Sequence, residues 1–552
     1  MSLDAITTEV IGHYLLAVAE EMGVALVKSA YSVNVKERYD CSSAILTANG
    51  ETVAQAAYQP IHLGSMLYLV TDILKRFPYT DIRPGDMFIS NDPYGGGGQH
   101  LPDLAVASPL FEGDRLIAWA ANIIHHSDVG GRVYGSMALD NTSIYQEGLR
   151  VPTVRIFDRG HLNEAVLEVI VQNSRLPEER TGDLRAQFSA NTLALQKLEE
   201  LKLRYGADAL TEGMDALLSA SERAFRIGLE ALPSGTSSWI ELVDDDGIGD
   251  TPVKIQVSVT LQGGQVILDF EGSDVQTRGA RNLVLSGLHS ICYYVMKAIV
   301  DPDLSTNGGY YRAITIKAPP GTVVNPLPPA ATAYRMETAQ RVVDAILGAL
   351  VELMPERVQA ASMGSGSFSL SGVDPLTAQP YSDYESMGGG GGAGCDYDGL
   401  DCVQVHGRNS GNVPIEVCEL EFPLLIDRYE IIPDSGGAGR QRGGLGMRRD
   451  IRVMRGNVVV NAMSDRHRTA ASGLLGGKPG ASGEFVLYRQ GVEIKFTGHI
   501  SELWLSAGDV FSVRTSGGGG FGDPHERDSR LVDADFADGL ISSRLPYRST
   551  DS

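Results

Sequence analysis

Four residues in the first quarter of the chain have the types and spacing to hold one metal ion: Asp40, His100, Asp103 and His125. His100 and Asp103 stand three residues apart in the irregular loop Asn91–Asp103, which contains two prolines and four glycines. Imidazole nitrogens combined with carboxylate oxygens suit Zn²⁺, Mn²⁺ or Fe²⁺ better than Mg²⁺ or Ca²⁺. The competing interpretation is that these side chains cap turns or bind water, because a histidine three residues before an aspartate is a weak pattern by itself.

A predicted β-hairpin brings two of these side chains together. Its strands are Leu104–Leu110 and Arg115–Ile124, and the turn is Glu112-Gly113-Asp114. If the hairpin closes about Gly113, Asp103 stands opposite Ile123 and Leu101 opposite His125. Side chains two apart on a strand share a face, so Asp103 and His125 become diagonal neighbours at the open end of the hairpin.

A second hairpin and the glycine loop supply the other two candidate ligands. Cys41–Thr47 and Thr52–Ala56 flank Asn49-Gly50, a strong hairpin signal that leaves Asp40 at the mouth of a strand. His100 can fold back from the glycine loop onto the same end. His126 alternates onto the opposite face from His125, which favours a role outside the ligand set.

Helical periodicity accounts for much of the remaining chain. Apolar residues at positions 11, 15, 18, 22 and 26 follow helical spacing, and Asp4 is a plausible N-cap. We also predict a helical hairpin (Asp183–Tyr205 and Leu210–Leu232) and then a β-rich stretch (Val253–Leu261 and Gln265–Phe270). Two further helices are predicted at Leu288–Val300 and Thr338–Leu353.

Glycine is in excess, with 64 in 552 residues, where average usage of about 7% would give roughly 39. Three glycine-rich runs lie after residue 387, at 388–394, 434–446 and 516–524. Glycine permits positive φ and close backbone packing at strand junctions, which is a sufficient structural reason for these runs. The runs are expected to separate short strands.

The fold class we predict is α+β and multidomain, with mixed β-sheets, a helical hairpin and a glycine-rich β C-terminal region. Length alone requires more than one domain. The predicted division is a metal-binding α+β domain (1–175), the helical hairpin (176–235), an α/β domain (236–380), the glycine-rich β domain (381–524) and a peripheral tail (525–552).

Composition excludes several classes of protein. The formal net charge is −23, from 46 Lys and Arg against 69 Asp and Glu, which argues against nucleic-acid and anionic-membrane surfaces. The five cysteines form no C-x-x-C pair, so a disulfide framework or thiolate zinc site is not expected. The N-terminus lacks a signal-peptide pattern and no apolar run approaches about 18 residues, so the expected location is the cytoplasm, with no membrane partner.

Several familiar binding and catalytic motifs are either absent from the sequence or matched only trivially. The run GGGGGAG matches a dinucleotide fingerprint only trivially, and no convincing buried strand precedes it. No phosphate-binding loop, nucleophile elbow or H-E-x-x-H sequence occurs. Asp244-Asp245-Asp246-Gly247 lacks the alternating ligands of a calcium loop, and Cys395 and Cys402 are expected to be ordinary thiols.

A set of longer motifs resembles the hydantoinase B/oxoprolinase family. They extend through nearly the whole chain, from about residue 4 to Pro524. The motifs are VNVKERYDCSSAIL (33–46), PIHLGSM (60–66), RPGDMFISNDPYGGGGQHLPD (83–103), HHSDVGG (125–131), IYQEGLRVP (144–152) and PDSGGAGRQRGGLG (433–446). The family comprises B-type subunits of ATP-dependent hydantoinases, 5-oxoprolinases and caprolactamase, with acetone and acetophenone carboxylase subunits as distant members.

The resemblance implies the same four metal ligands: the Asp after the KER element, the His and Asp of HLPD, and the first His of HH-D-GG, here Asp40, His100, Asp103 and His125. It also implies ring opening of a cyclic amide such as a hydantoin, 5-oxoproline or a lactam. The ion is expected to be one divalent transition metal, with Zn favoured over Mn or Fe. Cys41 and Gln99 depart from the family's usual residues beside two ligands, which leaves the substrate open.

The resemblance further implies a partner. An A-type subunit would bind ATP and Mg, and an A₂B₂ heterotetramer is the expected assembly. The residues that act as general acid and base stay unassigned, with His126 and Glu147 as guesses. Two alternatives remain: a subunit of an ATP-dependent ketone carboxylase, and a scaffold subunit whose metal is structural.

Overall fold

The N-terminal region is built on one antiparallel sheet, and the computed structural model describes residues 3–56 and 58–547. The strand order is β2-β1-β5-β4-β3-β6-β7. These strands are β1 (Cys41–Thr47), β2 (Thr52–Gln55), β3 (Met87–Ser90), β4 (Asp103–Glu112), β5 (Arg115–His125), β6 (Val154–Asp158) and β7 (His161–Leu162). Both predicted hairpins are present, with their turns at Asn49-Gly50 and at Gly113-Asp114.

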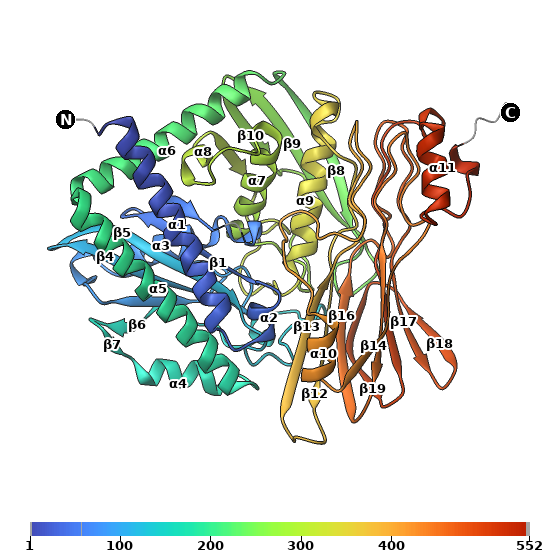
Figure 1. Cartoon of the computed structure of the whole chain (residues 1–552), viewed down its shortest axis with the longest axis horizontal. Helices are drawn as coiled ribbons and strands as arrows, with labels where there is room; N and C mark the ends of the chain where they lie inside the picture. The colour runs from blue at the N-terminus through green and yellow to red at the C-terminus, as the bar shows by residue number, and fades with distance from the viewer. Residues whose placement is uncertain (1–2, 57, 548–552) are drawn as a thin grey trace.

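Helices cover both faces of this sheet. On one face lie α1 (Ala5–Ser29) and α5 (Pro177–Tyr205), which cross in front of the sheet in Figure 1. On the other face α3 (Ser65–Arg76) packs against β1, β4 and β5. Two shorter helices, α2 (Val33–Lys36) and α4 (Glu164–Gln172), complete the region. The sheet is therefore buried on both sides, which places its strand ends, and the candidate ligands there, inside the protein.

Helix α1 begins where the sequence predicts. The Asp4 side chain accepts a hydrogen bond from the Thr7 backbone N–H at 3.0 Å, as an N-cap does. By length and composition α1 is apolar enough to cross a membrane. Its predicted apolar stripe, however, packs into the core between α5 and the sheet, so we interpret α1 as a core helix. The buried stripe is Ile11, Leu15, Val18, Met22 and Leu26.

The register of the β4–β5 hairpin differs from the predicted one by two residues. Asp103 stands directly opposite His125, whereas the prediction placed Ile123 there. Two features cause the difference: the strands join through the two residues Gly113 and Asp114, and the ladder shifts by one more residue between Leu110 and Phe111. The correction brings the two candidate ligands closer than a diagonal pair.

The middle region carries a four-stranded sheet of order β11-β10-β9-β8, in which β10 and β11 are parallel. Helices α7 and α9 pack on one face, where the hydrophobic core is largest. The strands β8 and β11 and the short helix α8 were not predicted, whereas α6, α7 and α9 match the expected helices to within a few residues. The elements are α6 (Ala207–Glu230), β8 (Gly235–Val243), β9 (Val253–Gln262), β10 (Gln265–Asp269), α7 (Leu285–Val300), α8 (Gly308–Tyr311), β11 (Ile314–Lys317) and α9 (Arg335–Leu350).

The C-terminal region is a β-sandwich. Sheets of order β13-β12-β16-β19 and β14-β15-β20-β17-β18 share one apolar core, in which Phe368 of the first contacts Phe511 of the second. The elements are β12 (Gly366–Val373), β13 (Pro380–Met387), α10 (Ile415–Glu421), β14 (Leu424–Ile431), β15 (Met447–Val453), β16 (Asn457–Ser464), β17 (Glu484–Arg489), β18 (Val492–Phe496), β19 (His499–Ser506), β20 (Val510–Arg514) and α11 (Ser529–Ala537). The α+β, multidomain class is confirmed, and the exact domain bounds stay a prediction.

The glycine-rich runs do more than separate strands, because they pack against one another as a layer. Backbone hydrogen bonds join them: the N–H of Gly444 donates to Gly391, and that of Gly518 donates to Gly444. These segments lie between α9 and α11 in Figure 1. A Cβ built on Gly518 would stand 2.0 Å from the carbonyl oxygen of Gly391. The predicted close backbone packing is confirmed, and it leaves no room for side chains.

This layer gives a stability prediction. Gly518→Ala forces a Cβ into a backbone oxygen that cannot turn away, so we expect a loss of at least about 3 kcal/mol, the upper end for overpacking. The control is Gly249→Ala, since the nearest heavy atom to its added Cβ is 3.7 Å away, and a change within about 0.5 kcal/mol is expected. Thermal unfolding of both variants checks this, and equal midpoints would contradict it.

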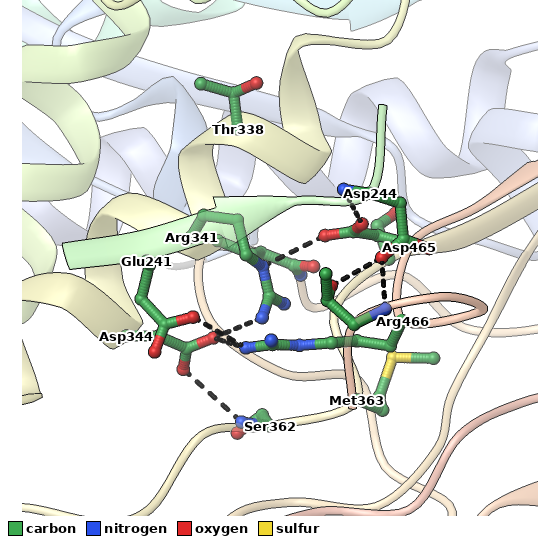
Figure 2. A network of polar contacts seen from close by, with 12 residues as sticks. Glu241, Asp244, Thr338, Arg341, Asp344, Ser362, Met363, Asp465 and Arg466 are labelled. Carbon is green, nitrogen blue, oxygen red and sulfur yellow. Dashed lines mark hydrogen bonds and ion pairs between the residues drawn. The ribbon is translucent and has the colours of Figure 1, made fainter. Parts of the chain in front are cut away.

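A buried network of charges fastens α9 to the middle sheet and the sandwich (Figure 2). The Arg341 guanidinium lies 2.7 Å from an Asp344 oxygen and 3.0 Å from Asp465, which follows β16. Arg466 contacts Asp344 at 3.0 Å. Asp244, from the acidic run after β8, accepts backbone N–H groups of residues 467–469 at 2.7–3.0 Å. That run is a structural turn, as predicted, and the network sets the position of α9.

Candidate metal centre

Three of the four predicted ligands meet at the open end of the β4–β5 hairpin. Asp103 begins β4, His125 ends β5, and His100 lies in the glycine loop before them. Each offers one ligand atom, all three atoms lie within 4.8 Å of one another, and all three residues are buried. The His100 Nε2 atom is 3.2 Å from Asp103 Oδ1, and the two imidazole centroids are 4.9 Å apart.

The orientation of His100 is set by residues far away in sequence. Its Nδ1–H donates to the carbonyl oxygen of Ala333 at 3.0 Å, which leaves the Nε2 lone pair facing Asp103. The Glu147 carboxylate in turn accepts the backbone N–H groups of Thr332 and Ala333 at 2.7 and 2.8 Å. Burial raises the pKa of Glu147 to about 8. Glu147 therefore positions the segment that orients His100.

The His125 ring is held between two side chains. Tyr384 of β13 stacks on it with centroids 5.1 Å apart and planes 7° apart. The Asn34 amide nitrogen lies 3.2 Å from His125 Nδ1 and donates to the His125 carbonyl at 2.7 Å. Among the described residues, His125 Nε2 is buried without a hydrogen-bond partner. A buried imidazole nitrogen without a partner, beside a carboxylate, is a donor atom whose lone pair a metal ion would satisfy.

Burial sets the protonation of this group. It lowers the pKa of His100, and that of His125 well below its usual value, so both imidazoles are neutral near pH 7. Burial alone would raise the pKa of Asp103, but the adjacent His100 ring and the charged Arg335 guanidinium outweigh it and hold that pKa well below its usual value. Two neutral imidazoles and one carboxylate fit a divalent transition ion.

The structure does not bring the Asp40 carboxylate into this three-residue group. Asp40 is partly buried and lies at the same end of the sheet, where its backbone carbonyl accepts the His125 N–H at 3.1 Å. Its place directly before β1 is as predicted, and its role as a fourth ligand stays a prediction.

Sequence reasoning missed His62, although it stands in the PIHLGSM motif. Its Nε2 lies 4.0 Å from Asp103 Oδ1. The Ser42 hydroxyl donates to the Cys41 carbonyl at 2.8 Å, so the His62 Nδ1, 3.0 Å away, donates to Ser42. That bond points the Nε2 lone pair of His62 towards Asp103. A lone histidine in a largely apolar segment carried no spacing signal that could have placed it here.

We expect His62→Ala to lower the affinity for the ion by about 10–100-fold, the range for groups that support metal ligands. The measurement is metal content after dialysis against a graded chelator series. Ser42→Ala, which removes only the partner of His62 Nδ1, should give a smaller loss. Asp40→Asn in the same series tests the ligand predicted from sequence. Unchanged affinity in His62→Ala would exclude His62 from the site.

The two guessed acid–base residues, His126 and Glu147, are bonded to other parts of the chain. The side chain of His126 points away from His125, and its Nε2 lies 3.1 Å from the Gln187 side-chain oxygen. Glu147 is engaged with the backbone of Thr332 and Ala333.

The two cysteines beside the glycine runs behave as predicted. Cys395 and Cys402 are partly buried, and burial raises the pKa of both thiols. That is the expected behaviour of ordinary thiols rather than reactive ones.

The chain is similar to known proteins along most of its length. The family model described as hydantoinase B/oxoprolinase matches residues 4–524. The 5-oxoprolinase PfmaA of Pestalotiopsis fici is 31% identical over 95% of this chain, which spans 42% of that protein. The putative B-type subunit of a D-/L-hydantoinase from a Pseudomonas species is 29% identical, covering 98% of this chain and 93% of its own.

Solved structures agree with the fold. The crystal structure of an ATP-dependent caprolactamase from Pseudomonas jessenii matches with a TM-score of 0.90 at 28% identity, covering 99% of this chain and 96% of that chain. An acetone carboxylase structure matches with a TM-score of 0.89 at 20% identity over 98% of this chain and 79% of its own, which shows a shared fold alone.

Proposed function

The chain belongs to the hydantoinase B/oxoprolinase family, and from this premise we propose that it is the metal-bearing subunit of an ATP-dependent cyclic-amide hydrolase. Its substrate would be a hydantoin, 5-oxoproline or another lactam. The observation that carries the proposal is the buried group of His100, Asp103 and His125 within 4.8 Å, with His125 Nε2 unpartnered among the described residues. Zn is the favoured ion, with Mn and Fe as alternatives, and Asp40 is the proposed fourth ligand.

The chain's own residues prepare this site before any substrate arrives. Neutral His100 and His125 present nitrogen lone pairs, while Arg335 donates to the second oxygen of Asp103 at 2.8 Å and fixes its first towards His100. Burial of all three excludes bulk water, which strengthens each electrostatic contact. A divalent ion held there would polarise a carbonyl oxygen or lower the pKa of a bound water.

ATP is proposed to act elsewhere. Opening an unstrained lactam ring is nearly balanced in free energy, so coupling to ATP makes it proceed. This chain has no phosphate-binding loop, and we assign ATP and Mg to a separate A-type subunit, as in an A₂B₂ assembly in the cytoplasm. The name of the Pseudomonas relative supports such a partner, whereas the 5-oxoprolinases join this region to further sequence in one chain.

The test is to purify the chain together with the A-type partner and supply ATP with a panel of hydantoins, 5-oxoproline and lactams. We expect ATP-dependent ring opening by the complex and no ATP hydrolysis by this chain alone. A carboxylated product from a ketone and bicarbonate would instead establish the carboxylase alternative. If loss of the metal lowers thermal stability and activity falls only in proportion to the unfolded protein, the alternative in which the metal is structural would be established.

A further inference from the structure

The side chain of Gln99, the residue directly before His100, reaches the helical turn Pro60–His62. Its amide nitrogen donates to the Ile61 carbonyl and, at 2.9 Å, to the Ser65 hydroxyl. The side chain is fully buried. The loop that carries the candidate ligand His100 is therefore bonded directly to the turn that carries the imidazole beside Asp103.

Three bonds locate His62, and they come from three parts of the chain. Its ring bonds to a serine of β1, as described above, and the Ile61 N–H donates to the Gly407 carbonyl at 3.0 Å. The bond from Gln99 to the Ile61 carbonyl is the third. Because that carbonyl belongs to the planar peptide that joins Ile61 to His62, holding it also holds the backbone of His62. The third bond comes from the residue before His100, so it relates the position of His62 to that of His100.

Helix α7 supports both segments. Its Ser290 hydroxyl accepts the Gly64 N–H at 2.8 Å and lies 3.4 Å from the Gln99 amide nitrogen. Its Ser286 hydroxyl lies 3.5 Å from the Gly98 carbonyl oxygen. A Cβ built on Gly64 would stand 3.1 Å from the Ser286 carbonyl oxygen, so the turn already lies in close contact with the helix. The turn and the glycine loop are therefore held against the same part of α7.

The bonds of its amide nitrogen are what Gln99 contributes here. Its amide oxygen is buried without a hydrogen-bond partner among the described residues. A buried acceptor that is left unpaired costs free energy. Helix α7 makes room for the side chain with a glycine, because a Cβ built on Gly287 would stand 3.2 Å from the Gln99 oxygen. The surroundings therefore fit a side chain that serves as a donor to the turn.

We propose that Gln99 is a positioning residue of the metal centre: through the Ile61 carbonyl it fixes how closely His62 approaches Asp103. The His62 Nε2 atom lies 4.0 Å from Asp103 Oδ1. Functional sites tolerate displacements of only about 0.5 Å, so a shift of the turn changes whether this imidazole supports the ion. The inference rests on the proposed function for the presence of that ion.

The experiment is a double-mutant cycle on the affinity of the whole chain for Zn²⁺, measured by competition with a chelator. The variants are Gln99→Met, His62→Ala and the two combined. We expect Gln99→Met to weaken binding about three- to tenfold, less than His62→Ala, because it displaces His62 without removing it. Once His62 is absent, Gln99→Met should change the affinity by less than about twofold. A residue that merely stabilises the fold would lower the affinity by the same factor in both backgrounds.

Two further variants separate positioning from damage to the fold. Ser290→Ala removes a hydroxyl beside the Gln99 amide, and it should give a smaller loss that again requires His62. Asn191→Leu is the matched control, because the buried amide nitrogen of Asn191 likewise donates to a backbone carbonyl and a serine hydroxyl, both of β4, at 3.3 and 3.0 Å. We expect this variant to leave the affinity for Zn²⁺ within about twofold of the wild type.

Equal Zn²⁺ affinity of Gln99→Met and the wild type would overturn the proposal. Equal losses from Gln99→Met with and without His62 would overturn it as well. A chain that binds Zn²⁺ as expected, in a complex that opens no cyclic amide, would refute the proposed function alone.

Discussion

Replacing His125 with alanine is expected to reduce the ATP-dependent activity of the complex to background while the chain stays folded. His125 ends β5, and its Nε2, unpartnered among the described residues, faces the group formed with Asp103 and His100. Groups that merely support metal ligands change affinity by 10–100-fold, so the loss of a ligand should exceed about 100-fold. Metal content by elemental analysis and turnover of the cyclic amide are the two measurements.

The neighbouring histidine supplies a matched control. His126 is equally buried and belongs to the same motif, but its ring forms a hydrogen bond with the Gln187 side chain instead of facing the candidate metal group. If a cavity in the sheet end were the cause of lost activity, His126→Ala would have the same effect as His125→Ala. We expect His126→Ala to retain the ion and most of the activity. A His125→Ala complex that is folded, metal-free and active would refute the catalytic role.

The sequence predicts much of this site, because strand pairing is a local property. Asp103 and His125 belong to one hairpin, and alternation along a strand is enough to place them on one face. The register was wrong by two residues because a two-residue turn and a ladder shift near Leu110 are not visible in residue types. The error of two residues in register does not change the predicted site, since Asp103 and His125 lie at the open end of the hairpin in either register.

Long-range contacts were beyond sequence reasoning. His62 approaches Asp103 from a short helical turn, Arg335 reaches it from the start of α9, and Glu147 acts through residues 332 and 333. Each contact joins segments that are far apart in the sequence, and neither strand alternation nor helical periodicity relates such segments. The motifs that contain His62 and Glu147 do not show, by their residue types or spacing, that one side chain approaches Asp103 and that the other binds residues 332 and 333.

The glycine runs illustrate a different limit. Their composition correctly predicts close backbone packing, yet not that three separate runs pack on one another. Gly391, Gly444 and Gly518 stand more than 50 residues apart and are linked by backbone hydrogen bonds alone. Such bonds leave no trace in side-chain patterns, so the layer could not be predicted from sequence.

The charge network around Arg341 is expected to give the largest stability effect in the protein. Arg341→Met leaves Asp344 and Asp465 buried without the guanidinium that lies 2.7 and 3.0 Å from them. Breaking a buried ion pair from one side typically costs about 3–5 kcal/mol. Unfolding midpoints in denaturant should fall accordingly, whereas Arg530→Met, which removes a surface pair 89% exposed at the arginine, should change stability by less than about 1 kcal/mol.

The size of this loss should depend on pH, with a definite sign. Burial raises the pKa of Asp344 and of Asp465 to about 8 in the folded protein, against the opposing charge of Arg341. Without Arg341 both carboxyl groups hold their protons more strongly when folded, while the unfolded chain releases them near pH 4. In both proteins the folded state binds more protons than the unfolded chain, so stability falls as the pH rises from about 4 to 8. Above about pH 8 the wild type releases these protons, whereas Arg341→Met keeps them and goes on losing stability, so the loss caused by the mutation grows there.

The comparison that decides this account is Arg341→Met against Arg341→Met/Asp465→Asn, with the wild type as the reference, each unfolded at pH 5.5 and pH 9. Asp465→Asn removes a carboxyl group that must take up a proton when the variant folds, so it should restore more stability at pH 9 than at pH 5.5, where the unfolded chain takes up that proton more readily. Since α9 also carries Arg335 to Asp103, metal affinity should fall with stability in the single variant and recover in the double one. Equal losses at both pH values would mean that packing around Arg341, not its charge, holds α9 in place.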